Sequence, residues 1–139
     1  MIDRERILSR IDHLQQYLRD LSTIVPPTFE AYQGVEKRRA CERLLQLAIE
    51  AMTDICGILV AGSRLGLPAE ALDMFEKLRE AAVITPETVT TLRRMRGFRN
   101  ILVHEYTQVD DQIVYHIASE RLGDFEVFIR EVLEHLADP

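Results

Sequence analysis

The sequence predicts an all-α fold, an up-and-down bundle of four main helices with one or two short helices beside them. Apolar residues recur at spacings of three and four over most of the chain, as in helices that bury one face. Proline is scarce inside these stretches, and tryptophan is absent. With 139 residues, 47% of them hydrophobic and 29% charged, the chain is predicted to form one globular domain over residues 1–139.

The first helix is predicted from Asp3 to about Ile24. Val25-Pro26-Pro27-Thr28 ends it, because proline and the residue before it disfavour helical backbone. One apolar stripe runs along this helix at spacings of four and three. The stripe consists of Ile7, Ile11, Leu14, Leu18 and Leu21.

A long second helix is predicted from residue 29 or 32 to residue 61, with Gly34 as a weak point near its start. Cys41 and Cys56 lie on it about 22 Å apart, at about 1.5 Å per residue, so they cannot pair with each other. Two reduced thiols fit a cytoplasmic protein. Glu50 and Asp54 lie one turn apart on the same helix. No histidine or cysteine stands near them at metal-ligand spacing, which favours a solvated acidic face.

Residues 62–68 are predicted to form a loop, followed by a short third helix over residues 69–82. The fourth helix begins at Thr85-Pro86-Glu87, with proline at the first helical position, and runs to Val103. Gln112 to Ile117 is ambiguous between helix and strand, and we expect it to be helical because four helices precede it. The last helix is predicted from Arg121 to Ala137.

Arg99 occupies an unusual place on the fourth helix. At about 100° per residue, it falls in the middle of an apolar face that also carries Leu92, Met95, Leu102 and Val103. A guanidinium keeps its proton, so burying it without a partner is costly. Either Arg99 is paired inside the core, or this face borders a cleft or an interface that an anion can reach.

A mostly cationic strip runs beside that face and ends on a histidine. Its members, Arg93, Arg96, Asn100 and His104, span an arc of roughly 80°. His104 and Tyr106 share a side only if the chain becomes extended after His104. The following residues are weakly helical, which favours an exit from the helix at that point.

The segment Met95-Arg96-Gly97-Phe98-Arg99-Asn100-Ile101-Leu102-Val103-His104-Glu105-Tyr106 resembles the Arg-x4-His-x-Tyr signature of HepT-type HEPN proteins. These proteins are the toxin partners of minimal nucleotidyltransferase (MNT) antitoxins in prokaryotes. Glu42-Arg43-Leu44-Leu45-Gln46-Leu47-Ala48-Ile49-Glu50-Ala51 resembles the second helix of that family. The resemblance covers roughly residues 1 to 135, and it implies a HEPN-like helical bundle.

The resemblance implies a metal-independent endoribonuclease and gives the segment's side chains roles. His104 would be the general acid and base, and Arg99 would stabilise charge at the phosphorus. Asn100 would orient His104 or bind the phosphate, and Arg96 and Arg93 would guide the RNA backbone. The expected product is a 2′,3′-cyclic phosphate. The sequence contains no metal-ligand cluster and no phosphate-binding glycine loop, so we expect neither metal nor cofactor.

Tyr106 matches the tyrosine that accepts AMP from the MNT antitoxin in HepT systems. An adenylyl group there would add bulk and negative charge beside Arg99 and His104, which would block a phosphate site. A structural interpretation also stands. Arg99 can pair with Glu50 or another acid at the edge of the core, and His104 can cap the helix. The alternative function is a non-catalytic helical module that docks a nucleotidyltransferase and supplies its nucleotide or substrate surface.

Charge is distributed unevenly along the chain, whose net charge is −6. Residues 1–104 carry 15 basic and 14 acidic side chains, whereas residues 105–139 carry 2 and 9. A local phosphate site is therefore compatible with a chain whose end would repel a long polyanion. We expect the cluster Lys37-Arg38-Arg39 to be a solvated helix face. No signal-type apolar run follows the charged N-terminus and no uncharged run approaches about 18 residues, so we expect a cytoplasmic protein without a membrane partner.

Gly97 lies inside the fourth helix, where glycine costs about 1 kcal/mol relative to alanine. Close approach of another helix, within the fold or across a dimer, would explain its presence. Together with Arg99 on an apolar face, Gly97 suggests that the fourth helix lies at a two-fold interface. The expected partners are RNA, an MNT-family nucleotidyltransferase and a second copy of the chain. The homodimer and the nucleotidyltransferase could together form a larger hetero-oligomer.

Overall fold

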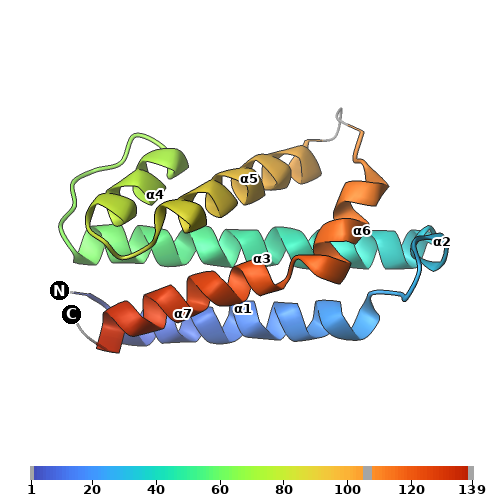
Figure 1. Ribbon diagram of the computed structural model, residues 1–139, viewed down its shortest axis with the longest axis horizontal. Helices are drawn as coiled ribbons and strands as arrows, with labels where there is room; N and C mark the ends of the chain where they lie inside the picture. The colour runs from blue at the N-terminus through green and yellow to red at the C-terminus, as the bar shows by residue number, and fades with distance from the viewer. Residues whose placement is uncertain (1, 105–107, 138–139) are drawn as a thin grey trace.

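The computed structural model describes residues 2–104 and 108–137 and shows seven helices there, with no strand (Figure 1). They are α1 Arg4–Ile24, α2 Phe29–Tyr32, α3 Val35–Gly62, α4 Ala71–Glu80, α5 Pro86–Val103, α6 Asp111–Glu120 and α7 Gly123–Ala137. The all-α prediction is confirmed. So is the prediction that the ambiguous stretch around residues 112–117 is helical.

Helix α3 is the central element of the bundle, and it contacts α1, α4, α5 and α6. Figure 1 shows α1 running alongside α3 on one side, while α4 and α5 lie on the other side. The predicted stripe of α1 is buried in full, and its members are Ile7, Ile11, Leu14, Leu18 and Leu21. Helices α1 and α7 meet near the ends of the chain, where Arg4 Nη1 donates a 2.6 Å hydrogen bond to the carbonyl of Leu136.

The predicted second helix is interrupted at its expected weak point. Gly34 has extended backbone (φ −65°, ψ 140°) and serves as the N-cap of α3, so residues 29–32 form a separate short helix. The Thr28 hydroxyl caps that short helix by accepting a 3.2 Å hydrogen bond from the Ala31 amide. Cys41 and Cys56 are buried in α3 and unpaired, as predicted, and burial raises the pKa of both thiols.

By length and composition, α3 is the one described helix that could cross a membrane. Its most apolar window has a mean hydropathy of 1.7, and 56% of that window is buried inside the bundle. The central helix of a bundle meets the same criteria, because it packs against helices on several sides. The length of uncharged runs does not indicate this helix, because Glu50 and Asp54 interrupt its apolar stretch.

Glu131 of α7 fixes the start of α5. Its carboxylate accepts hydrogen bonds from the backbone amide of Thr85, at 2.7 Å, and from the hydroxyl of the buried Thr88. The Thr85 hydroxyl in turn caps the helix by accepting from the Thr88 amide at 3.2 Å. These contacts hold the N-terminus of α5 against α7, at the opposite end from the predicted site.

Replacing Glu131 with alanine should therefore lower the free energy of unfolding by about 1–3 kcal/mol, since it leaves two donors without their acceptor. Urea denaturation of the variant measures this change. Glu134→Ala is the matched control, because Glu134 lies one turn further along α7 and is well exposed. Equal losses in the two variants would mean that Glu131 does not anchor α5.

Candidate functional site

Helix α5 ends where the sequence predicted, and the chain leaves it in an extended conformation. His104 is the C-cap, with φ −87° and ψ 115°, and its amide donates a 3.4 Å hydrogen bond to the Ile101 carbonyl. The His104 side chain is exposed. Tyr106, the predicted AMP acceptor, lies outside the described residues.

Arg99 joins α5 to α3 through Glu50. Its Nε and Nη2 donate to Glu50 Oε2 at 2.9 and 2.7 Å, and its Nη1 donates to Asn100 Oδ1 at 3.3 Å. The Arg99 and Glu50 side chains are 24% and 30% exposed. The structural interpretation of Arg99, pairing at the edge of the core, is therefore what the structure shows. The expectation of a solvated acidic face is wrong for Glu50 and holds for Asp54, which is exposed.

The apolar face around Arg99 is buried only in its first half. Leu92 and Met95 are buried, Leu102 is partly buried, and Val103 is 37% exposed, so the end of this face lies at the surface. The Arg99–Glu50 ion pair also joins this part of α5 to α3.

The environment of Glu50 gives it an altered pKa. Partial burial raises this pKa, but hydrogen bonds from Arg99 and Gln46 and the nearby positive charges lower it more, so the net pKa lies below its ordinary value. A carboxyl group with a depressed pKa in the folded state stabilises the fold fully above its ordinary pKa. That contribution is lost as the pH falls through the folded-state pKa.

The melting temperature of the wild type should therefore fall more steeply than that of Glu50→Gln as the pH is lowered from about 6 to about 3. The glutamine variant has no carboxyl group to protonate at this position. Thermal melts of both proteins across this range measure the difference. Asp54→Asn, one turn further along α3, is the control and should keep the wild-type slope. Parallel curves for the wild type and Glu50→Gln would contradict the role given to the ion pair.

The members of the predicted cationic strip have different surroundings in the structure. Arg93 Nη2 lies 3.5 Å from Glu76 Oε2 of α4, and Glu76 also binds Arg79. Arg96 is partly buried and makes no hydrogen bond or ion pair with the residues that the structure describes. Asn100 is exposed and accepts its hydrogen bond from Arg99. Of the two arginines predicted to guide RNA, Arg96 is thus the one without a competing carboxylate within the described parts of the chain.

His104 lines a polar pocket of about 360 Å³ between the start of α3, the end of α5 and the start of α6. The lining residues are Arg38, Arg39, Glu42, Leu102, His104, Gln108, Val109 and Asp111. Arg99 and Asn100 are not among them, so within one chain this pocket contains His104 without the other two predicted catalytic residues. Arg38 is partly buried and lies 3.5 Å from Asp111, which corrects the expectation of a fully solvated cluster at residues 37–39. No pattern in the sequence links residue 38 to residue 104.

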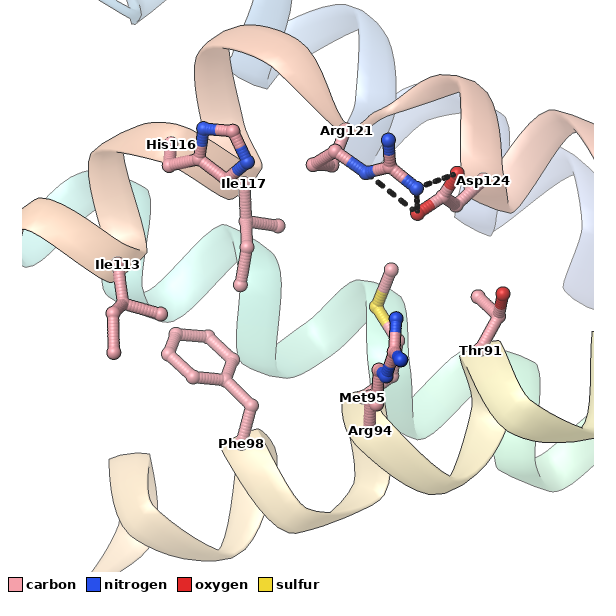
Figure 2. A pocket seen from close by; sticks show the side chains of 9 residues that line it. All are labelled: Thr91, Arg94, Met95, Phe98, Ile113, His116, Ile117, Arg121 and Asp124. Atoms are coloured by element: carbon pink, nitrogen blue, oxygen red, sulfur yellow. Dashed lines mark hydrogen bonds and ion pairs between the residues drawn. The ribbon is translucent and has the colours of Figure 1, made fainter.

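A second cavity, of about 440 Å³, separates α5 from α6 and the start of α7. Figure 2 shows Met95 and Phe98 of α5 facing Ile117 of α6, with the Arg121–Asp124 ion pair at one side. Its lining is mainly apolar and includes none of the residues predicted to act in catalysis. This cavity is therefore distinct from the pocket of His104.

Comparison with known proteins identifies the family. The family model described as "Ribonuclease HepT-like" matches residues 14–132, which is most of the chain. The chain belongs to the HepT-like family. The resemblance seen in the sequence is thus confirmed. The match includes both Arg99 and His104, and it also includes Glu50.

Curated relatives of this HepT-like chain carry nuclease names. The "tRNA nuclease HepT" of Aphanizomenon flos-aquae is 28% identical over 131 residues, covering 94% of this chain and 89% of the relative. The "mRNA nuclease HepT" of Shewanella oneidensis is 38% identical over 85 residues, covering 61% of this chain and 64% of the relative. The chain therefore spans slightly less than two thirds of the Shewanella protein. A "Putative RNase" of Archaeoglobus fulgidus is 30% identical, covering 93% and 92%.

Solved structures of toxin–antitoxin complexes share the fold of the HepT-like chain. A toxin–antitoxin structure with AMP-PNP matches with a TM-score of 0.87 and 26% identity, covering 94% of this chain and 99% of the other. The tri-AMPylated HEPN toxin of Shewanella oneidensis, in complex with MNT antitoxin, matches with a TM-score of 0.86 and 27% identity, covering 92% and 96%. The predicted HEPN-like bundle is confirmed.

Proposed function

We propose that this chain is the toxin of a HEPN/MNT toxin–antitoxin pair and acts as a metal-independent endoribonuclease. The observation that carries the proposal is the position of His104, exposed at the end of α5 and lining a pocket that contains two arginines. Nuclease names among its relatives support the same activity. The RNA supplies the nucleophile, so the protein needs only a proton-transfer group and cations beside the phosphorus.

In the proposed reaction, the 2′-hydroxyl of the RNA attacks the adjacent phosphorus while His104 accepts its proton. The bond from phosphorus to the 5′-oxygen breaks, that oxygen takes up the proton that His104 carries, and a 2′,3′-cyclic phosphate remains. Arg99 stabilises the charge that develops on the phosphate oxygens, and Asn100 orients the participants. Arg96 and Arg93 contact the RNA backbone further along.

Within one chain, Arg99 lies outside the pocket of His104. We therefore propose that the active enzyme is a homodimer with α5 at the two-fold axis, where Arg99 and His104 of both chains face one cleft. Gly97 supports this arrangement, because a Cβ atom at that position would meet nothing within 4 Å among the described residues. No contact within the described fold accounts for this glycine. The exposed Ile101, one turn further on, supplies apolar area to the same face. Sedimentation at micromolar concentration should give the mass of two chains.

We propose that an MNT nucleotidyltransferase silences the toxin by adenylylating Tyr106. The tyrosine oxygen attacks the α-phosphorus of ATP, pyrophosphate leaves, and the resulting phosphodiester adds negative charge two residues from His104. The AMPylated state of the Shewanella HEPN toxin supports this regulation. Mass spectrometry after incubation with the nucleotidyltransferase and ATP should show added AMP on the wild type and none on residue 106 of Tyr106→Phe.

The direct test is RNA cleavage in excess EDTA by the protein produced without its partner. Cleavage that leaves 2′,3′-cyclic phosphate ends supports the metal-independent ribonuclease. The absence of cleavage by protein with unmodified Tyr106 would favour the docking module, the second candidate function. The engagement of Arg99 by Glu50 is the observation that favours this second function, because it gives Arg99 a structural role.

A further inference from the structure

We infer that Arg38 and Arg39 form, with His104, a binding site for one phosphodiester of single-stranded RNA next to the bond that is cleaved. This inference rests on the proposed ribonuclease activity and adds two residues from α3 to the substrate site. It begins from the pocket of about 360 Å³ that these three side chains share. Both its size and the hydrogen-bond donors of its arginines suit a phosphate group with part of its ribose.

The two arginines keep donors that an incoming phosphate can use. The Arg39 Nη1 atom donates to Glu42 at 2.9 and 3.3 Å, while the side chain as a whole is 68% exposed. A guanidinium has five N–H groups, and Glu42 occupies only this one nitrogen. Glu42, which is 13% exposed, thus fixes the direction of Arg39 without using its whole donor fork.

Arg38 is held more loosely. Its Nη1 lies 3.5 Å from Asp111 Oδ2, longer than the about 2.7–2.9 Å of a well-formed hydrogen bond between charged groups. Its Nε is buried and has no acceptor among the described residues. A phosphate that takes over the Nη atoms of Arg38 therefore replaces a weak contact.

The charges that line the pocket limit it to one anion. Arg38 and Arg39 are matched in number by Glu42 and Asp111, and the arginine donors that these carboxylates leave unused can bind one phosphodiester. The two carboxylates also discourage a second phosphate from entering.

Arg99 contributes differently within the same chain. Two of its nitrogens bind Glu50 and the third binds Asn100, and it does not line the pocket of His104. The cations that share a cavity with His104 in one chain are thus Arg38 and Arg39. We assign these two to substrate positioning.

The test measures binding of a short single-stranded RNA whose riboses are 2′-O-methylated, so that no cleavage can occur. Arg39→Gln should weaken binding about tenfold and lower the slope of log K against log salt by about 0.7, the value for one lost phosphate contact. Arg38→Gln should weaken binding similarly, and Arg38→Lys should retain part of the affinity. Because Arg39 is exposed, its replacement leaves the packing of α3 unchanged.

Arg130→Gln is the matched control, since Arg130 is 66% exposed and lies 4.0 Å from an acid one turn away, Glu134, on α7. It should leave both the affinity and the salt slope unchanged. Equal losses in Arg39→Gln and Arg130→Gln, or no loss in either, would overturn the inference, as would a wild type that does not bind the RNA. A wild type that binds through Arg39 but cleaves no unmodified RNA would contradict the ribonuclease proposal and leave the binding site standing.

Discussion

His104→Ala should lower the rate of RNA cleavage in EDTA by about 10²–10⁴-fold, the usual contribution of a general acid or base. The physical reason is that His104 is the one imidazole among the described side chains of the pocket, whose other ionisable groups are arginines and carboxylates. The measurement is single-turnover cleavage of a labelled RNA. Binding of the 2′-O-methylated RNA should change much less than the cleavage rate.

The same variant separates the two candidate functions. A docking module has no need of the His104 side chain, so association with a nucleotidyltransferase should survive the substitution. His135→Ala is the control, because His135 lies on α7 and lines a different cavity. Equal cleavage by the wild type and His104→Ala would place the reaction elsewhere or attribute it to a contaminant.

Arg99→Lys should reduce cleavage by about 10²-fold although it preserves the charge. Lysine offers a single nitrogen, so it cannot bind Glu50 and still direct other donors toward a phosphate, as the guanidinium can. Stability should fall by only about 1 kcal/mol, because both partners remain partly exposed. Single-turnover kinetics and urea denaturation of the same preparation measure the two effects.

Glu50→Gln tests whether cleavage depends on the negative charge of Glu50 or only on the orientation that residue 50 gives to Arg99. It retains Arg99 and replaces the carboxylate with a neutral acceptor, so a smaller loss of cleavage than in Arg99→Lys is expected. Arg94→Lys on the same helix is the matched control and should leave cleavage unchanged. Unchanged cleavage in Arg99→Lys would assign Arg99 to the structural role alone.

The positions of most helices could be predicted from the sequence, because each depends on a local pattern. The stripe of α1, proline at the start of α5 and Gly34 before α3 are signals of this kind. The exit of the chain at His104 also followed from weak helix propensity after it. Family resemblance then selected Arg99 and His104 from several other polar residues.

The surroundings of these residues could not be predicted, because they depend on how distant helices pack. The ion pair of Arg99 with Glu50 spans 49 positions in the sequence. Its formation depends on how α3 and α5 pack together, which no local pattern in the sequence specifies. No local pattern in the sequence indicates that Arg38 lies near His104. From the sequence alone, Lys37-Arg38-Arg39 is therefore predicted to be an ordinary solvated cluster.

The pocket of His104 has three walls that come from separate parts of the chain, near residues 38, 104 and 111. During synthesis the chain emerges from its N-terminus, and contacts between distant segments form late. A nascent chain that stops before residue 111 lacks one wall of this pocket. Incomplete products of translation should therefore bind RNA poorly at this site, so the proposed cleavage would begin only after most of the chain has left the ribosome.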